Sequence, residues 1–150
     1  MKPAAGFTLI EVLMVVVLIG ILSAAVLPQF VNFTQDAKTA VTKQKLNAMK
    51  VAIIGDSSMV SQGQITKLGF IKNIGAPPVS LNDLSTQGAY GVYNPMTKLG
   101  WNGPYVDTSS ASWNQDAWGS TIQYNAVTRT ISSCGPDKIC GNADDISISF

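Results

Sequence analysis

The chain has 150 residues, a net charge of +1 and no His. That length leaves room for one modest domain besides a long helix, and a net charge so close to zero argues against a nucleic-acid partner held by bulk electrostatics. The absence of His removes the commonest general base, the Ser-His and Cys-His nucleophile pairs and histidine metal sites, so we expect no enzymatic activity.

The first element is an apolar segment that carries a single charge. Residues 7–31 contain no Lys or Arg and one carboxylate, Glu11. A helix of more than about 18 apolar residues is long enough to cross a hydrocarbon core roughly 30 Å thick. We therefore expect residues 7–31 to be transmembrane. Lys2 then keeps the N-terminus in the cytoplasm, and the C-terminal part is exported.

Glu11 needs a partner in such a segment. A carboxylate in a transmembrane helix costs on the order of 2.5 to 3.5 kcal/mol at the centre of the bilayer, and somewhat less near an end. A cut after Gly6 would supply a cation, because the new α-amino group of Phe7 would lie one helical turn from Glu11. That amine can pair with Glu11 or with the same glutamate of a neighbouring copy.

Residues Gly6-Phe7-Thr8-Leu9-Ile10-Glu11, followed by a long apolar helix, resemble the prepilin signal of the type IV pilin and type II secretion pseudopilin superfamily. The resemblance implies that residues 1–6 are a leader and that prepilin peptidase cuts after Gly6. It also implies that Phe7 is then methylated. Glu11 lies at the position where this family carries its glutamate, and we expect it to act in assembly.

Other interpretations of this segment stay open. A secretory signal peptide has an apolar region of about 7 to 15 residues before a small-residue site. Ser23-Ala24-Ala25 can serve as such a site, but here the apolar run is longer and contains a glutamate. An uncut single-pass anchor leaves Glu11 unexplained. A membrane-anchored periplasmic binding module, a different class of function, also predicts an intact Gly6–Phe7 bond.

The helix signal continues beyond the apolar segment. Residues 35–54 are rich in good helix formers, and Pro28 is expected to kink the helix and not to end it. Pilins of this group often carry a proline at that position. One helix is therefore predicted over residues 7–54. Two sets of side chains in its second half recur at helical spacing: Val41, Ala48 and Ala52, or Leu46, Met49 and Ile53.

The second half of this helix is basic. Its lysines are Lys38, Lys43, Lys45 and Lys50, against one acidic residue, Asp36. They are either a solvated face or contacts to acidic residues of neighbouring subunits.

A loop-rich section is predicted after the helix. Gly55-Asp56-Ser57-Ser58 ends the helix, although Met59 and Val60 can extend it slightly. A short amphipathic segment is expected over residues 66–74, followed by a capped helical turn over residues 80–84 in which Asp83 suits the N-terminus.

The last third predicts a small sheet. Residues 121–126, 128–132 and 146–150 alternate apolar and polar side chains, which is typical of short antiparallel strands. The segments around Trp101 and Trp118 resemble two landmarks of the major pseudopilins of type II secretion. We expect the aromatic side chains of this region to anchor the core and its loops: Trp101, Tyr105, Trp113, Trp118 and Tyr124.

Residues 133–146 concentrate three carboxylates, those of Asp137, Asp144 and Asp145. Calcium prefers six to eight oxygen ligands, but Asp is also an ordinary turn residue, so the chemistry alone leaves a metal open. In major pseudopilins the corresponding loop binds one structural calcium. That resemblance implies a calcium held by these three carboxylates and by a carbonyl near Ser133.

Cys134 and Cys140 lie in the same loop. An oxidising compartment permits a disulfide between them, and closing so short a loop contributes roughly 2 kcal/mol. The bridge can hold the loop together with calcium or instead of it, and two free buried thiols are the alternative. Two sulfurs without His do not predict a zinc site.

Together these features predict an α+β fold shaped like a lollipop, in which a long N-terminal transmembrane helix packs on a small C-terminal antiparallel sheet in a periplasmic domain, residues 55–150. The resemblance implies a structural subunit of a periplasmic pseudopilus for type II protein secretion. The alternative is a major or minor type IV pilin for adhesion, motility or DNA uptake.

The resemblance also implies partners and a location. The partners are further copies in a helical filament, the prepilin peptidase, an inner-membrane assembly platform and minor pseudopilins. Before assembly, the chain would cross the bacterial inner membrane once.

Overall fold

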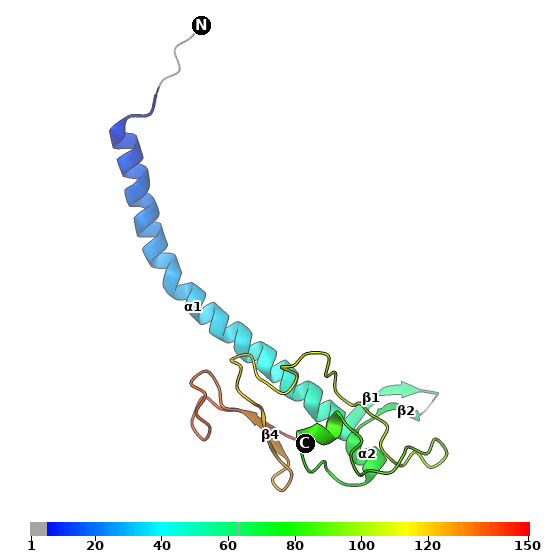
Figure 1. The fold of residues 1–150 in the computed structure, drawn as a ribbon. Helices are drawn as coiled ribbons and strands as arrows, with labels where there is room; N and C mark the ends of the chain where they lie inside the picture. The colour runs from blue at the N-terminus through cyan, green and yellow to red at the C-terminus, as the bar shows by residue number, and fades with distance from the viewer. Residues whose placement is uncertain (1–5, 63) are drawn as a thin grey trace. The chain divides into compact units, whose positions relative to one another are not determined.

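The computed structural model describes residues 6–62 and 64–150, and it describes their side chains except for residues 25–31, 64 and 65. Apart from Gly6, the predicted leader lies outside the described residues. The chain divides into two compact units, residues 1–37 and 38–150. The elements are those of an α+β fold with one long helix and small antiparallel sheets, as predicted (Figure 1).

Helix α1, Leu9–Ile54, is the longest element and runs from blue to cyan in Figure 1. From Leu9 to Leu22 every large apolar side chain is more than half exposed. The helix continues through Pro28, as expected. The kink predicted at Pro28 lies in residues 25–31, whose side chains are not described, and stays a prediction. Among the described residues, which are interrupted there, no helix is long and apolar enough to cross a membrane.

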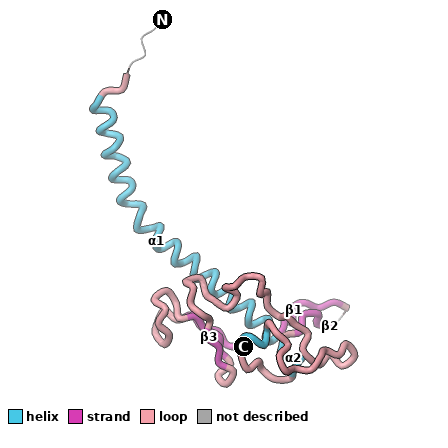
Figure 2. Tube along the Cα trace, in the orientation of Figure 1, coloured by secondary structure: helices cyan, strands magenta, loops and turns pink. Residues whose placement is uncertain are grey.

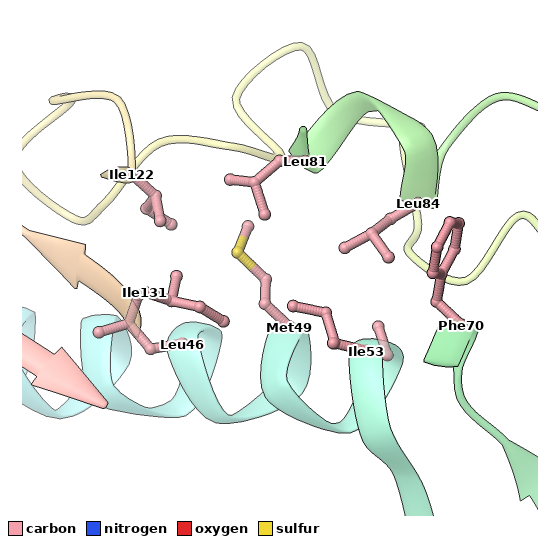
Figure 3. Packing of buried hydrophobic residues seen from close by; sticks show 9 residues of the cluster. Leu46, Met49, Ile53, Phe70, Leu81, Leu84, Ile122 and Ile131 are labelled. Atoms are coloured by element: carbon pink, nitrogen blue, oxygen red, sulfur yellow. The ribbon is translucent and has the colours of Figure 1, made fainter. Parts of the chain in front are cut away.

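The second half of α1 supplies one wall of the core of residues 38–150. Leu46, Met49 and Ile53 are at most 3% exposed, whereas Val41 is 54% exposed, so the second of the two predicted sets faces inward. Ala52 of the first set is also buried, at 4% exposure. Spacings of three and four residues place these side chains on one stripe of the helix. They pack with five buried residues from the rest of this unit (Figure 3): Phe70, Leu81, Leu84, Ile122 and Ile131.

A β-hairpin follows the helix where we expected a loop or a short helical extension, so that expectation was wrong. Strand β1, Gly55–Ser61, pairs antiparallel with β2, Gln64–Leu68. Gly55 ends α1 with a φ of +89°, and a Cβ on it would lie 2.7 Å from the backbone nitrogen of Gly69. A glycine is therefore needed at this position, and backbone pairing across the hairpin, not side-chain periodicity, creates the strands.

Two short helices lie between the hairpin and the sheet. The predicted segment 66–74 is helical only in α2, Phe70–Ile74, because its first residues pair in β2. The predicted capped turn is the 3-10 helix η1, Leu81–Leu84. There the backbone N–H of Ser80 donates to the Asp83 carboxylate at 3.1 Å. The predicted turn is thus confirmed.

The C-terminal sheet has the predicted antiparallel strands, each shorter than expected. Its order is β3-β4-β5, formed by β3 Gln123–Asn125, β4 Thr130–Ser133 and β5 Ile146–Ser149 (Figure 2, magenta). Ile131 pairs with Tyr124 on one side and Ile148 on the other and is fully buried. This row of side chains is the face that the sheet turns toward the core.

The aromatic residues act as anchors. The indole N–H of Trp101 donates to the carbonyl of Asp83 at 2.8 Å, and the Tyr105 ring meets the Phe70 ring edge-on at 5.6 Å between centroids. The hydroxyl of Tyr124 donates to the carbonyl of Pro78 at 2.6 Å. Trp101, Tyr105 and Tyr124 thus pack against the core, as Trp113 also does, and the polar atoms of Trp101 and Tyr124 tie loops to it. Trp118 is not part of this cluster.

Candidate functional site

The candidate processing site lies ahead of the first helical residue. Gly6 and Phe7 are exposed and non-helical, and the Phe7 ring is 89% exposed. Since α1 begins only at Leu9, the Gly6–Phe7 peptide bond is not engaged in a helix. A protease can therefore reach this bond without unwinding α1.

Glu11 has a local partner that the sequence analysis missed. Its Oε2 accepts hydrogen bonds from the Thr8 backbone N–H at 2.8 Å and from the Thr8 hydroxyl at 2.7 Å. The Glu11 N–H lies 3.4 Å from the Thr8 hydroxyl oxygen. This is a capping box, in which residues three apart satisfy the free N–H groups at a helix start. The Thr-x-x-Glu pattern before an apolar run was the available signal.

The capping box gives Glu11 neutral donors but no cation. No ion pair of Glu11 occurs in the part of the chain that the structure describes. No cation of the described residues therefore neutralises this carboxylate, which lies at the start of an exposed apolar helix, where the helix dipole favours a negative charge. A cation from outside this chain's described residues can still reach it.

The lysines of α1 do not act as one set. The Lys45 ammonium donates to the carbonyls of Ser112 at 2.7 Å and Gln115 at 2.5 Å. Burial lowers the pKa of Lys45, and the nearby charge of Asp116 partly opposes this. Lys45 therefore holds a loop of its own chain, so neither predicted role applies to it. Lys38 and Lys43 are exposed, and both predicted roles stay open for them.

Asp116 is a buried carboxylate that the sequence analysis also missed. It is 7% exposed, and its Oδ1 accepts from the backbone N–H groups of Trp118 at 2.9 Å and Ser120 at 2.8 Å. Its Oδ2 accepts from the Ser133 hydroxyl at 2.6 Å, and the Ser133 oxygen accepts from the Gly135 N–H at 3.2 Å. Asp116 thus ties the 116–120 turn to the start of the C-terminal loop. The available signal was an Asp that opens a Gly-containing turn.

The C-terminal loop between β4 and β5 is closed covalently. The structure joins Cys134 and Cys140 in a disulfide. Cys134 is 3% exposed at the end of β4, whereas Cys140 is exposed. Asp137 lies inside the ring that this bridge closes, and Asp144 and Asp145 follow it.

The three predicted calcium ligands are held by donors of the loop itself. Asp137 accepts from the Ile139 N–H at 2.8 Å and the Asn142 amide at 2.7 Å. Asp144 Oδ2 accepts from the Asp137 N–H at 3.4 Å, and Asp145 Oδ2 accepts from the Gly141 N–H at 2.7 Å. Among the described residues, no three acidic or cysteine side chains converge as a metal-binding group.

One oxygen of the loop is left without a partner. Asp145 Oδ1 is the buried side-chain atom that makes no hydrogen bond among the described residues. A buried carboxylate oxygen in this state is costly unless a donor or a cation meets it. Calcium draws many of its ligands from backbone carbonyls and water, so one such oxygen is compatible with a calcium site without three converging carboxylates.

Comparisons with known proteins point to the N-terminal segment. Residues 1–27 match the family described as the prokaryotic N-terminal methylation motif. The chain is 45% identical to type II secretion system core protein G of Pseudomonas aeruginosa over 52 residues, which cover 35% of this chain and 37% of that protein. It is 46% identical to a fimbrial protein of Pseudomonas aeruginosa over 54 residues, covering 35% and 34% of the two chains.

One further relative extends over most of the chain. Fimbrial protein Q of Moraxella bovis is 26% identical over 142 residues, covering 89% of this chain and 87% of that protein. By contrast, the chain covers only about a third of the length of the two Pseudomonas aeruginosa relatives. No solved structure matches the chain significantly. The N-terminal methylation motif and these relatives together support the superfamily of type IV pilins and type II secretion pseudopilins.

Proposed function

We propose that this chain is a structural, non-catalytic subunit of a pilin-like filament that is processed after Gly6. The observation that carries the proposal is the N-terminal motif, in which an accessible Gly6–Phe7 bond precedes an apolar helix. The side chains of residues 9–22 are exposed on that helix and have no core of their own. Such a helix is stable in lipid or packed among similar helices.

Two successive environments, first the membrane and then a bundle of helices, bury the exposed apolar side chains of this helix. Before assembly, residues 7–31 anchor the subunit in the bacterial inner membrane, with the N-terminus cytoplasmic and the C-terminal unit periplasmic. After the cut, transfer of the helix into a bundle of identical helices preserves its apolar burial. The proposed partners are the prepilin peptidase, an inner-membrane assembly platform, further copies of this chain and minor pseudopilins.

Glu11 is proposed to set the axial register between neighbouring subunits of the filament. In an apolar bundle, an unpaired carboxylate is strongly unfavourable, and a fitting cation removes that cost. The α-amino group of Phe7 on the axial neighbour is such a cation. A misplaced subunit leaves the charge unpaired and is therefore rejected.

The leading assignment is the pseudopilus of a type II secretion system. It is supported by the similarity to core protein G and by the resemblance of the segments around Trp101 and Trp118 to those of major pseudopilins, of which Trp101 packs against the core. The similarity to fimbrial protein Q over most of the chain supports the alternative, a type IV pilin. A deletion strain separates them: retention of exported hydrolases indicates the pseudopilus, whereas loss of surface filaments alone indicates the pilus.

The mature N-terminus tests the proposed processing. Mass spectrometry of the protein purified from its bacterium should find N-methylated Phe7 as the first residue. Gly6→Val should keep the leader, and because nothing lies within 4 Å of a Cβ at Gly6, that variant alters the peptidase site and not the fold. An intact Gly6–Phe7 bond, or a cut after Ala25, would contradict the proposal.

We also propose a structural calcium in the C-terminal loop, supported by the unpartnered Asp145 oxygen. A ligand at 100 times its Kd stabilises by about 2.7 kcal/mol, which corresponds to roughly 10 °C in the melting midpoint of a domain this size. Chelator should lower the midpoint by that amount in the wild type and in Asp107→Asn, but not in Asp145→Asn. Identical wild-type midpoints with calcium and with chelator would rule this site out.

A further inference from the structure

A cleft of about 350 Å³ lies between the second half of α1, strand β2 and residues 105–113. Its apolar lining includes Met49 and Trp113, and its charged lining is formed by Lys45, Lys67 and Asp107. The lining therefore carries one net positive charge. An apolar cleft with a few charged groups is typical of a binding site, and this one suits an apolar side chain with a carboxylate beside it.

The ammonium group of Lys45 is fixed at this cleft. It donates to the backbone carbonyls of Ser112 and Gln115, which are neutral acceptors. Burial lowers the pKa of Lys45, and the nearby charge of Asp116 opposes this in part. A further negative charge near the cleft would favour the charged form of Lys45. The electrostatics of the cleft thus select an acidic partner.

The C-terminal loop of the same chain has the complementary chemistry. Ile139 lies in the ring that Cys134 and Cys140 close, and its side chain is 65% exposed. Its backbone N–H donates to Asp137 Oδ1 at 2.8 Å, which keeps this exposed carboxylate close to it. Residues 134–145 carry three carboxylates and one lysine, a net charge of −2. The bridge and the hydrogen bond order the loop in advance, so docking costs less conformational entropy.

The loop does not fill the cleft of its own chain. Figure 1 shows residues 134–145, orange to red, projecting away from the β1–β2 hairpin, whose β2 strand borders the cleft. Ile139 stays exposed there. An occupant of the cleft must therefore come from another molecule.

We propose that the cleft binds the C-terminal loop of a second copy of this chain, with Ile139 of that copy in the cleft and its Asp137 facing Lys67. The inference rests on the proposed filament and assigns one contact within it. Burial of Ile139 removes apolar surface from water, and the opposite charges fix the orientation. Because loop and cleft are different surfaces, the contact is heterologous, and repeated head-to-tail contacts of this kind build an open helical polymer.

Photocrosslinking in cells that assemble the full-length chain tests which residues meet. Ile139→benzoylphenylalanine places the photoreactive group on the loop, and mass spectrometry of the cross-linked dimer identifies the partner peptides. We expect peptides that contain Met49 or residues 105–113. Val127→benzoylphenylalanine is the matched control, because Val127 is 93% exposed and lies outside the loop. It should not cross-link to these peptides.

A charge exchange tests the pairing independently. Lys67→Asp and Asp137→Lys should each lower the yield of sheared filaments by about threefold, since exposed ion pairs are modest. The double variant should restore the yield. Lys72→Asp, an exposed lysine outside the cleft, should leave it unchanged. A hairpin disturbed by Lys67→Asp would not be repaired by a change in the distant loop, so rescue is specific to the contact.

The results also separate this contact from the filament itself. Filaments without cross-links from residue 139 to the cleft peptides, or without rescue in the double variant, would overturn the contact and leave the proposed function. A wild-type chain that is cut after Gly6 but forms no filament would overturn the proposed assembly, and the contact with it.

Discussion

Glu11→Ala should leave the chain anchored and cut after Gly6, yet filament yield should fall by at least about tenfold. The reason is that the proposed pair between Glu11 and the Phe7 amine of a neighbour lies in an apolar bundle. Loss of one member leaves the other charge unpaired there at a cost of about 3 to 5 kcal/mol, well above the 1.4 kcal/mol that corresponds to tenfold. Sheared filaments and the mass of the mature N-terminus measure assembly and processing separately.

Two further variants separate this role from helix capping. Thr8→Val removes the hydroxyl that donates to Glu11 at 2.7 Å and should cost about 1 kcal/mol of helix stability with little loss of filaments. Asp36→Ala removes an exposed carboxylate farther along α1 and should assemble normally. Normal filaments from Glu11→Ala, or equal defects in Glu11→Ala and Thr8→Val, would refute the pairing with a neighbour.

Asp116→Ala should be the most destabilising single polar substitution in residues 38–150, at about 3 kcal/mol. Removal of this carboxylate leaves the N–H groups of Trp118 and Ser120 and the hydroxyl of Ser133 without their acceptor. Each unsatisfied buried donor costs about 1 to 3 kcal/mol, partly relieved by water. Urea unfolding followed by tryptophan fluorescence measures the loss in the free energy of unfolding.

The matched control for Asp116 is Asp107→Ala. Asp107 also accepts a backbone N–H, that of Ser109 at 2.9 Å, but it is exposed, so water replaces the lost acceptor and we expect a change under about 1 kcal/mol. Asp116→Asn keeps one oxygen for the two backbone donors. Its loss in the free energy of unfolding should therefore lie between those of Asp116→Ala and Asp107→Ala. Equal losses for Asp116→Ala and Asp107→Ala would show that the buried network does not stabilise the fold.

Several elements could be predicted because their signals are local. Leu46, Met49 and Ile53 recur at helical spacing and are buried, and the alternation around Ile131 and Ile148 marks paired strands. Ser80 and Asp83 form their turn within four residues of chain. In each case the residues that create the element are close in sequence, so their order is sufficient.

Other features depend on partners that are distant in sequence. The β1–β2 hairpin has no regular alternation of side chains, and its strands exist because Gly55 meets Gly69 and the backbones pair. Lys45 had the pattern of a surface lysine, yet it binds carbonyls 67 and 70 residues away. The periodicity of side chains cannot predict such contacts, because they depend on which distant segment packs against the residue in the folded chain.

The sequence by itself determined the long helix, the C-terminal sheet and the position of one carboxylate in an apolar segment, and its N-terminal motif pointed to the superfamily. These follow from composition and spacing, which act over a few helical turns or one strand pair. Only the tertiary structure decided that Thr8 caps Glu11, that Asp116 joins the 116–120 turn to Ser133, and that Cys134 and Cys140 form a disulfide and are not free thiols. The physical reason is that a buried polar group must find its partner wherever folding places one.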